Sequence, residues 1–163
     1  MIDLERQVRS LLDRETIRTK LHDYSRIIDA WDVEKLRDCF TDDVRATYNY
    51  NEIDGIEALV NYFKAYQFAP ACQVQKLLAR SHFIGNMDIT LDGDSAKSTT
   101  YLLALNIAED DSLHTRCNYY HDQWVRGADG DWKIRHRHHV TNWLARSEIE
   151  IDPDNHALRK SAA

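Results

Sequence analysis

The chain has 163 residues, of which 43% are hydrophobic and 29% charged, and this balance suits one globular domain with a single core. Its formal net charge of -6 argues against nucleic acid or an anionic membrane as the main partner, and no apolar run approaches the ~20 residues of a membrane span. The N-terminus lacks the basic and then apolar layout of a signal peptide, so we expect a cytoplasmic protein that binds neither nucleic acid nor a membrane.

Helical patterns occupy the first third of the sequence. One buried helical face is indicated by residues that recur at steps of three and four: Ile17, Leu21, Tyr24 and Ile28. Asp32 is expected to cap a short second helix that extends to Phe40. Asp54 and Glu57 have capping-box spacing and predict a third helix through Phe63.

Four long β-rich runs follow, at about residues 77–91, 95–108, 114–126 and 131–144. Turn signals separate them at residues 92–94, 109–112 and 127–130. Short connections between consecutive strands predict an antiparallel meander rather than β-α-β units. The chain is polar after Arg146 and contains Pro153, so we expect one domain over residues 1–146 and a loose or domain-swapping tail over residues 147–163.

Helices followed by a long antiparallel sheet predict an α+β fold in which the sheet curls around the helices. Such a sheet leaves a deep pocket along its concave face, where small molecules bind. Phosphate-loop, dinucleotide-binding and G-x-S-x-G motifs are absent from the sequence. Any chemistry therefore has to come from side chains acting directly, and no cofactor is expected.

Histidine is the first candidate for such chemistry, because its charge can change near neutral pH. His82 lies in a predicted strand, with Arg80, Ile84 and Asn86 expected on its own face. The opposite face is more apolar and carries Phe83, Met87, Ile89 and Leu91. Alternation alone does not decide which face lines a pocket, and a structural histidine bonded to a backbone carbonyl is the alternative.

Asp29 is unusual because it falls at the end of a helix, where the macrodipole disfavours a negative charge. Ile27 and Ile28 precede it and Trp31 follows, which indicates partial burial. A buried carboxylate needs a partner. The alternative is an aspartate that forms the turn between two helices.

The run from Arg135 to His139 raises the question of a metal site. Alternation places His136 and His138 on one face, and Arg135, Arg137 and His139 on the other. The neighbouring arginines would repel a cation, and no carboxylate or cysteine completes a ligand set at familiar spacing. Three widely spaced cysteines without a C-x-x-C pair indicate neither a thiolate zinc site nor a disulfide framework. We therefore expect no metal and interpret one face of this run as a basic pocket wall.

Two of the predicted strands offer further polar candidates. Over residues 115–126, the side with Cys117 is expected to be enclosed, so Tyr119 and His121 are predicted to line the pocket. The opposite side carries Arg116, Asn118, Tyr120, Asp122 and Arg126. Asn106 ends a face shared with Leu102, and it is interpreted either as the capped end of a strand or as a substrate contact.

Three segments of the chain resemble the SnoaL-like family, which belongs to the nuclear-transport-factor-like superfamily. They are residues 24–32 (YSRIIDAWD) with Leu36 and residues 40–43 (FTDD), residues 81–86 (SHFIGN), and residues 129–137 (DGDWKIRHR). The resemblance covers about residues 5–145. It implies a cone-shaped barrel, in which N-terminal helices pack on a strongly curved sheet that encloses a pocket.

Within this family, the chain is similar to enzymes of the scytalone-dehydratase type, to hexachlorocyclohexane dehydrochlorinases and to bile-acid dehydratases. The resemblance implies that Asp29 and His82 form a catalytic dyad. It further implies a leaving-group contact at Arg137 and a functional tyrosine at Tyr24. Tyr48 corresponds to a substrate-polarising tyrosine, and His121 stands where the scytalone enzyme has an amide side chain. Ile28 departs from the scytalone pattern, which carries a second tyrosine there, so scytalone itself is not the expected substrate.

The resemblance, together with these residues, implies a cofactor-independent lyase that acts on a small aromatic or cyclic molecule. His82 is the expected general base and Asp29 its orienting partner. The same pair also fits an isomerase, and the fold also fits an oxygenase small subunit or a protein that binds a small ligand without turnover. The family resemblance further implies a homo-oligomer, either a trimer or a dimer.

Overall fold

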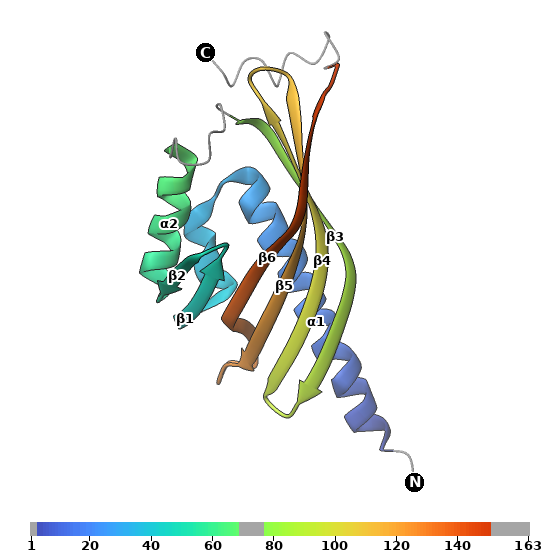
Figure 1. The fold of residues 1–163 in the computed structure, drawn as a ribbon. Coiled ribbons are helices and arrows are strands. Elements are labelled where there is room, and N and C mark those ends of the chain that lie inside the picture. Colours follow the sequence, from blue (N-terminus) through green and yellow to red (C-terminus); the bar gives the residue numbers. More distant parts are fainter. Residues whose placement is uncertain (1–2, 69–76, 151–163) are drawn as a thin grey trace.

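The computed structural model describes residues 3–68 and 77–150 of the chain (Figure 1). In chain order the elements are α1 (Leu4–Ala30), the 3₁₀ helix η1 (Val33–Asp38), β1 (Phe40–Tyr48), β2 (Asn51–Asp54), α2 (Ile56–Phe68), β3 (Leu77–Asp92), β4 (Ser95–Ala108), β5 (Ser112–Arg126) and β6 (Trp132–Glu148). Figure 1 shows α1 lying along one face of the curved sheet, with α2 beside β1 and β2. The predicted α+β class and the helices packed on a curved sheet are confirmed. The sheet is mixed and stays open rather than closing into a barrel.

The six strands form one sheet in the order β2-β1-β6-β5-β4-β3. Strands β3 to β6 make the antiparallel meander that the short turns predict. The bounds of β3 and β4 agree with the predicted runs to within a residue, but β6 extends to Glu148. Residues 147 and 148 of the expected tail are therefore strand, and residues 151–163 lie outside the described part of the chain.

Strands β1 and β2 correct the helical interpretation of the first third. The second helix ends at Asp38, and Phe40, which was expected within that helix, begins β1. Strand β1 pairs in parallel with β6, where Tyr48 lies opposite His139. Charged residues in the middle of β1 hide its alternation, and its partner strand lies near the other end of the sequence. Local patterns therefore could not predict this pairing.

A β-bulge in β3 changes which side chains share a face. Ile84 pairs with Leu102 and Met87 with Thr100, so two residues of β3 lie opposite one residue of β4. The extra residue reverses the alternation along the strand. Met87, Ile89 and Leu91 consequently join the core, although simple alternation places them on the face opposite His82.

The core lies between α1 and the sheet. Ile17, Leu21, Tyr24 and Ile28 are all buried, which confirms the predicted helical face. Burial of each such side chain contributes about 1.5–3 kcal/mol, so this face fixes α1 and its C-terminal end against β3. No helix in the described ranges is long and apolar enough to cross a membrane.

Candidate active site

Asp29 and His82 meet where the end of α1 packs on β3. Oδ1 of Asp29 lies 2.6 Å from Nδ1 of His82, and the backbone N–H of His82 donates to Oδ2 at 3.0 Å. His82 therefore contacts both oxygens of the Asp29 carboxylate, one through its ring and one through its backbone N–H. The side chains of His82 and Asp29 are 11% and 29% exposed, so the pair is enclosed but reachable from solvent.

The electrostatics of Asp29 explain how a carboxylate is tolerated at a helix C-terminus. Partial burial acts to raise its pKa, but the two hydrogen bonds from His82 and the nearby charge of Arg80 outweigh burial, and the pKa is lowered. Asp29 is therefore ionised at neutral pH. An ionised carboxylate accepts the proton on Nδ1 of a neutral imidazole, which leaves Nε2 as the basic nitrogen of His82.

Trp31 ends α1 beside this pair in a left-handed conformation, with φ of 57°. Such a backbone conformation is unusual for a bulky residue and is held by its surroundings. Its N–H bonds back to carbonyls of α1, the Arg80 guanidinium lies 3.8 Å from its ring centroid, and Phe63 of α2 packs edge-on against it. This cap fixes the direction in which Asp29 points.

A second group of polar side chains lies deeper on the helix-facing side of the sheet. The hydroxyls of Tyr24 and Tyr48 are 3.1 Å apart, and burial raises the pKa of both phenols well above the ordinary range. Arg137 lies against the rings of Tyr24 and Tyr120. Its Nε and Nη2 donate to the two carboxylate oxygens of Asp122 at 2.7 and 2.8 Å, and both partners are completely buried.

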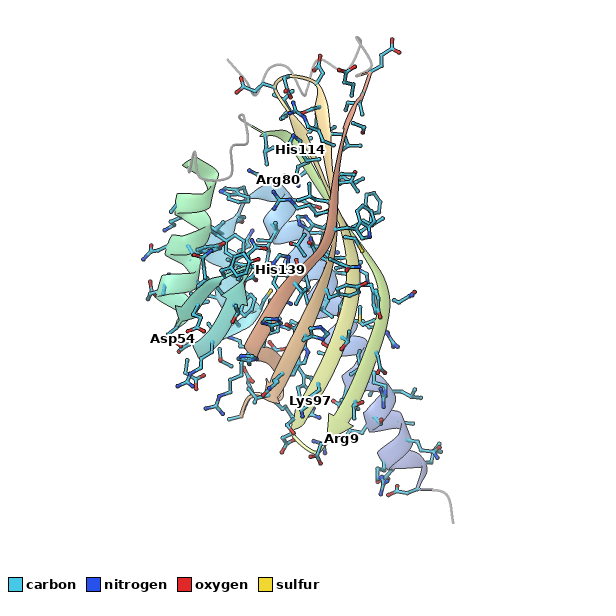
Figure 2. The ribbon with its side chains drawn as sticks, viewed as in Figure 1. Arg9, Asp54, Arg80, Lys97, His114 and His139 are labelled. Atoms are coloured by element: carbon cyan, nitrogen blue, oxygen red, sulfur yellow. The ribbon has the colours of Figure 1, made fainter. Side chains whose placement is uncertain are left out.

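His139 belongs to the same group. Its ring lies between the rings of Tyr48 and Tyr120, with centroids 5.3 and 5.5 Å away. Burial and then the charge of Arg137 lower the pKa of His139 to about 3, so this histidine is neutral at physiological pH. Figure 2 shows His139 and Arg80 in the layer between the helices and the sheet, with Lys97 and Arg9 toward the other end of the molecule.

Two predicted pocket residues lie on the other side of the sheet. The expectation that Tyr119 and His121 are enclosed is wrong, because His121 is exposed and bonds Thr99, while Tyr119 packs on Tyr101 and accepts from the exposed Asn142. The alternation along the strand was predicted correctly, but the wrong one of its two faces was taken as the buried face. Trp124, which is buried on the Tyr120 side, was the signal that could have decided it.

Asn106 is half-buried and pairs with Arg80 of β3 and His114 of β5. It therefore lies two residue pairs beyond the pair of His82 and Ala104 on the same strands, and Figure 2 shows His114 farther along the sheet than His139. The residues that the sequence reasoning missed are Asn118, Tyr120 and Asp122, all buried on the helix-facing side.

Metal ligands do not cluster in the part of the chain that the structure describes. Within residues 3–68 and 77–150, no three His, Cys, Asp or Glu side chains lie close enough to hold an ion. His136 and His138 share the outer side of the sheet, as predicted, and line an open groove there together with His121. Arg135 does not share the inner face with Arg137, because a bulge in β6 turns it outward to Asp43.

The fold and this geometry define an α+β protein whose curved sheet carries a histidine–carboxylate pair beside a buried tyrosine–arginine cluster. A family model described as a SnoaL-like domain matches residues 9–138, which is most of the chain, so the protein belongs to the SnoaL-like domain family. No curated protein matches the sequence.

Several solved structures share this fold. A hexachlorocyclohexane dehydrochlorinase from Novosphingobium barchaimii is 18% identical, with a TM-score of 0.74 over 93% of this chain and 99% of that one. A candidate scytalone dehydratase from Novosphingobium aromaticivorans is 20% identical, with a TM-score of 0.72 over 90% and 95% of the two chains. The ActVI-ORFA protein of Streptomyces coelicolor is 19% identical, with a TM-score of 0.67 over 79% and 97%. At these identities the likeness shows the fold alone.

Proposed function

We propose that this protein is a cofactor-independent lyase in which His82 removes a proton from a carbon atom of a small cyclic substrate. The observation that carries the proposal is the 2.6 Å contact between Nδ1 of His82 and Asp29. Because that contact occupies Nδ1, Nε2 is the nitrogen that receives the proton. Asp29 holds the ring in this tautomer and stabilises the imidazolium that forms.

The tyrosine–arginine cluster supplies the second half of the elimination. Tyr24 and Tyr48 stay protonated because burial raises their pKa values, so their hydroxyls can donate to a carbonyl or to a departing group. Arg137 places a positive charge beside both phenols. The names of two structural neighbours, a dehydrochlorinase and a candidate dehydratase, agree with an elimination.

The proposal predicts that His82→Gln and Asp29→Asn each lower kcat by about 10²–10⁴-fold, the usual contribution of a positioned general base. The wild-type protein is incubated with a chlorinated cyclohexane and with hydroxylated bicyclic ketones. Chloride release reports dehydrochlorination, and a rise in ultraviolet absorbance reports the new double bond of a dehydration. His22→Gln, at an exposed position of α1, is the matched control and is expected to keep full activity.

A kcat of His82→Gln that equals that of the wild type would contradict the assignment of the base. Mass spectrometry of the product separates the two reactions that the same pair can perform, because an isomerase returns a product of unchanged mass. A protein that binds these compounds tightly and converts none of them would be a binding protein instead.

A further inference from the structure

Four buried polar side chains on the helix-facing side of the sheet have atoms without a hydrogen-bond partner among the described residues. Thr100, Asn118, Arg137 and His139 are 0%, 3%, 0% and 8% exposed. The atoms concerned are Oγ1 of Thr100, Oδ1 of Asn118, Nη1 of Arg137 and Nδ1 of His139. Native proteins satisfy nearly all such atoms, so a group of them in one region calls for an explanation.

The strand register brings these atoms to one region. Thr100 lies opposite Tyr120, Tyr120 opposite His139, and His139 opposite Tyr48 in adjacent strands. Asn118 is two residues from Tyr120 and therefore on the same side of β5. Asn118 pairs with Thr141, which makes it a diagonal neighbour of His139, at a typical spacing of about 7–8 Å.

The chemistry of these atoms selects the group that would satisfy them. Oδ1 of Asn118 accepts a hydrogen bond and Nη1 of Arg137 donates one. His139 is neutral, so its Nδ1 either donates or accepts according to the tautomer. A hydroxyl can donate and accept at once and rotates to suit, whereas a halide or a carbonyl only accepts and an ammonium only donates.

From this we infer that the site takes a hydroxylated substrate, whose hydroxyl oxygen accepts from Nη1 of Arg137 while its proton is donated to Asn118 or His139. The inference rests on the proposed function and deepens it, because it names the group by which the substrate is held at the end remote from His82.

The distance to the catalytic pair sets the size of such a substrate. Asn118 pairs with Leu102, which pairs with Ile84, two residues from His82 on β3. Strands β3 and β5 are two positions apart in the sheet, a separation of about 10 Å. A molecule with two fused rings has about this length, so it would place a carbon near Nε2 of His82 and its hydroxyl at the buried group.

The test compares two probes that differ in one group, 2-naphthol and 2-chloronaphthalene. Fluorescence titration of the full chain gives both dissociation constants. We expect wild-type protein to prefer 2-naphthol by at least about tenfold, the usual effect of one satisfied buried hydrogen bond. Asn118→Leu and His139→Phe should abolish that preference, because each removes one of the polar atoms that lack a partner among the described residues. Asn142→Leu and His138→Phe, at exposed positions, are the matched controls.

A second measurement does not depend on the variants. The side-chain nitrogen resonances of His139 in the wild-type protein should shift when 2-naphthol is added and stay unchanged with 2-chloronaphthalene. Equal affinity for the two probes, or a preference that both variants retain, would overturn the inference and leave buried water as the partner of these atoms. The His82→Gln variant separates the two proposals, because it should lose turnover and still prefer 2-naphthol.

Discussion

His139 combines deep burial with a neighbouring guanidinium, and this combination links the stability of the protein to pH. Burial and the charge of Arg137 lower the pKa of His139 to about 3 in the folded protein, whereas an unfolded histidine titrates near ~6.5. Between these two values the unfolded state binds more protons than the folded state. Stability is therefore lost as the pH falls from about 6.5 toward 3, by about 1.4 kcal/mol per pH unit from this residue.

His139→Phe is predicted to weaken the loss of stability at acidic pH. Urea unfolding at about pH 7, 5.5 and 4.5 gives the free energy of unfolding for each variant. The difference between His139→Phe and the wild type should grow in favour of the variant as the pH falls. His138→Phe, at an exposed site, should follow the wild type. Parallel profiles for His139→Phe and the wild type would show that His139 is not the group responsible.

Asp29 and His82 were candidates from the sequence because each residue type is unusual for its position, and the family resemblance then implied their pairing. A carboxylate at a helix C-terminus among apolar residues needs a partner, and a histidine in a strand can be that partner. Arg137, Tyr24 and Tyr48 were named only through the family resemblance. Asp122 was missed because nothing local marks an aspartate in a strand as the partner of a buried arginine.

The orientation of His82 relative to the second half of β3 depends on a single extra residue in the strand. Gly85 and Asn86 together lie opposite Tyr101, and the alternation of the strand reverses across them. His82 on one side of the bulge and Ile89 on the other therefore both face the helices. Gly85 fits here because a side chain would approach the carbonyl oxygen of Tyr101 to 3.3 Å.

Deletion of Asn86 is predicted to remove the bulge and turn one half of β3 over. Either His82 leaves Asp29 or Met87, Ile89 and Leu91 leave the core, because a one-residue shift moves every side chain to the other face. We expect a loss of about 4 kcal/mol or more in the free energy of unfolding. Asn86→Ala keeps the extra residue at an exposed position and should cost little. A deletion variant with wild-type Tm and activity would contradict this account of the bulge.

Across the whole molecule, the outer side of the sheet carries an apolar row that runs over four strands. Phe83 pairs with Leu103, Leu103 with Cys117, and Cys117 with Trp143. Phe83, Leu103 and Trp143 are 59%, 40% and 47% exposed. Contiguous exposed apolar surface of this kind marks interaction sites.

The homo-oligomer that the family resemblance implies stays a prediction, and this row is the surface that would form it. Light scattering after size-exclusion chromatography is expected to give a dimer or a trimer for the wild type. Phe83→Glu with Trp143→Glu should give a monomer, because burial of two carboxylates in the contact is unfavourable. Tyr50→Glu, at a position 99% exposed in the β1–β2 turn, is the control and should assemble normally. A wild-type monomer at all concentrations would contradict the prediction.

The sequence by itself determined the helical face of α1, the four strands of the meander and the class of the fold. These features are local, since each depends on a periodicity of 3.6 or 2 residues and on turns between neighbouring elements. It also made Asp29 and His82 candidates, and the family resemblance implied that the two form a pair.

Only the tertiary structure decided which face of each strand looks inward. Periodicity states which residues share a side of a strand but not which side is buried. Tyr119 and His121 were therefore predicted on the inner side of β5, which in the structure carries Tyr120 and Asp122 instead. The bulge in β3 and the pairing of β1 with β6 depend on partners distant in the sequence. The Asp122–Arg137 pair forms only once those strands are side by side, because a buried polar group acquires its partners from packing. The same holds for the group of atoms around His139 that have no partner among the described residues.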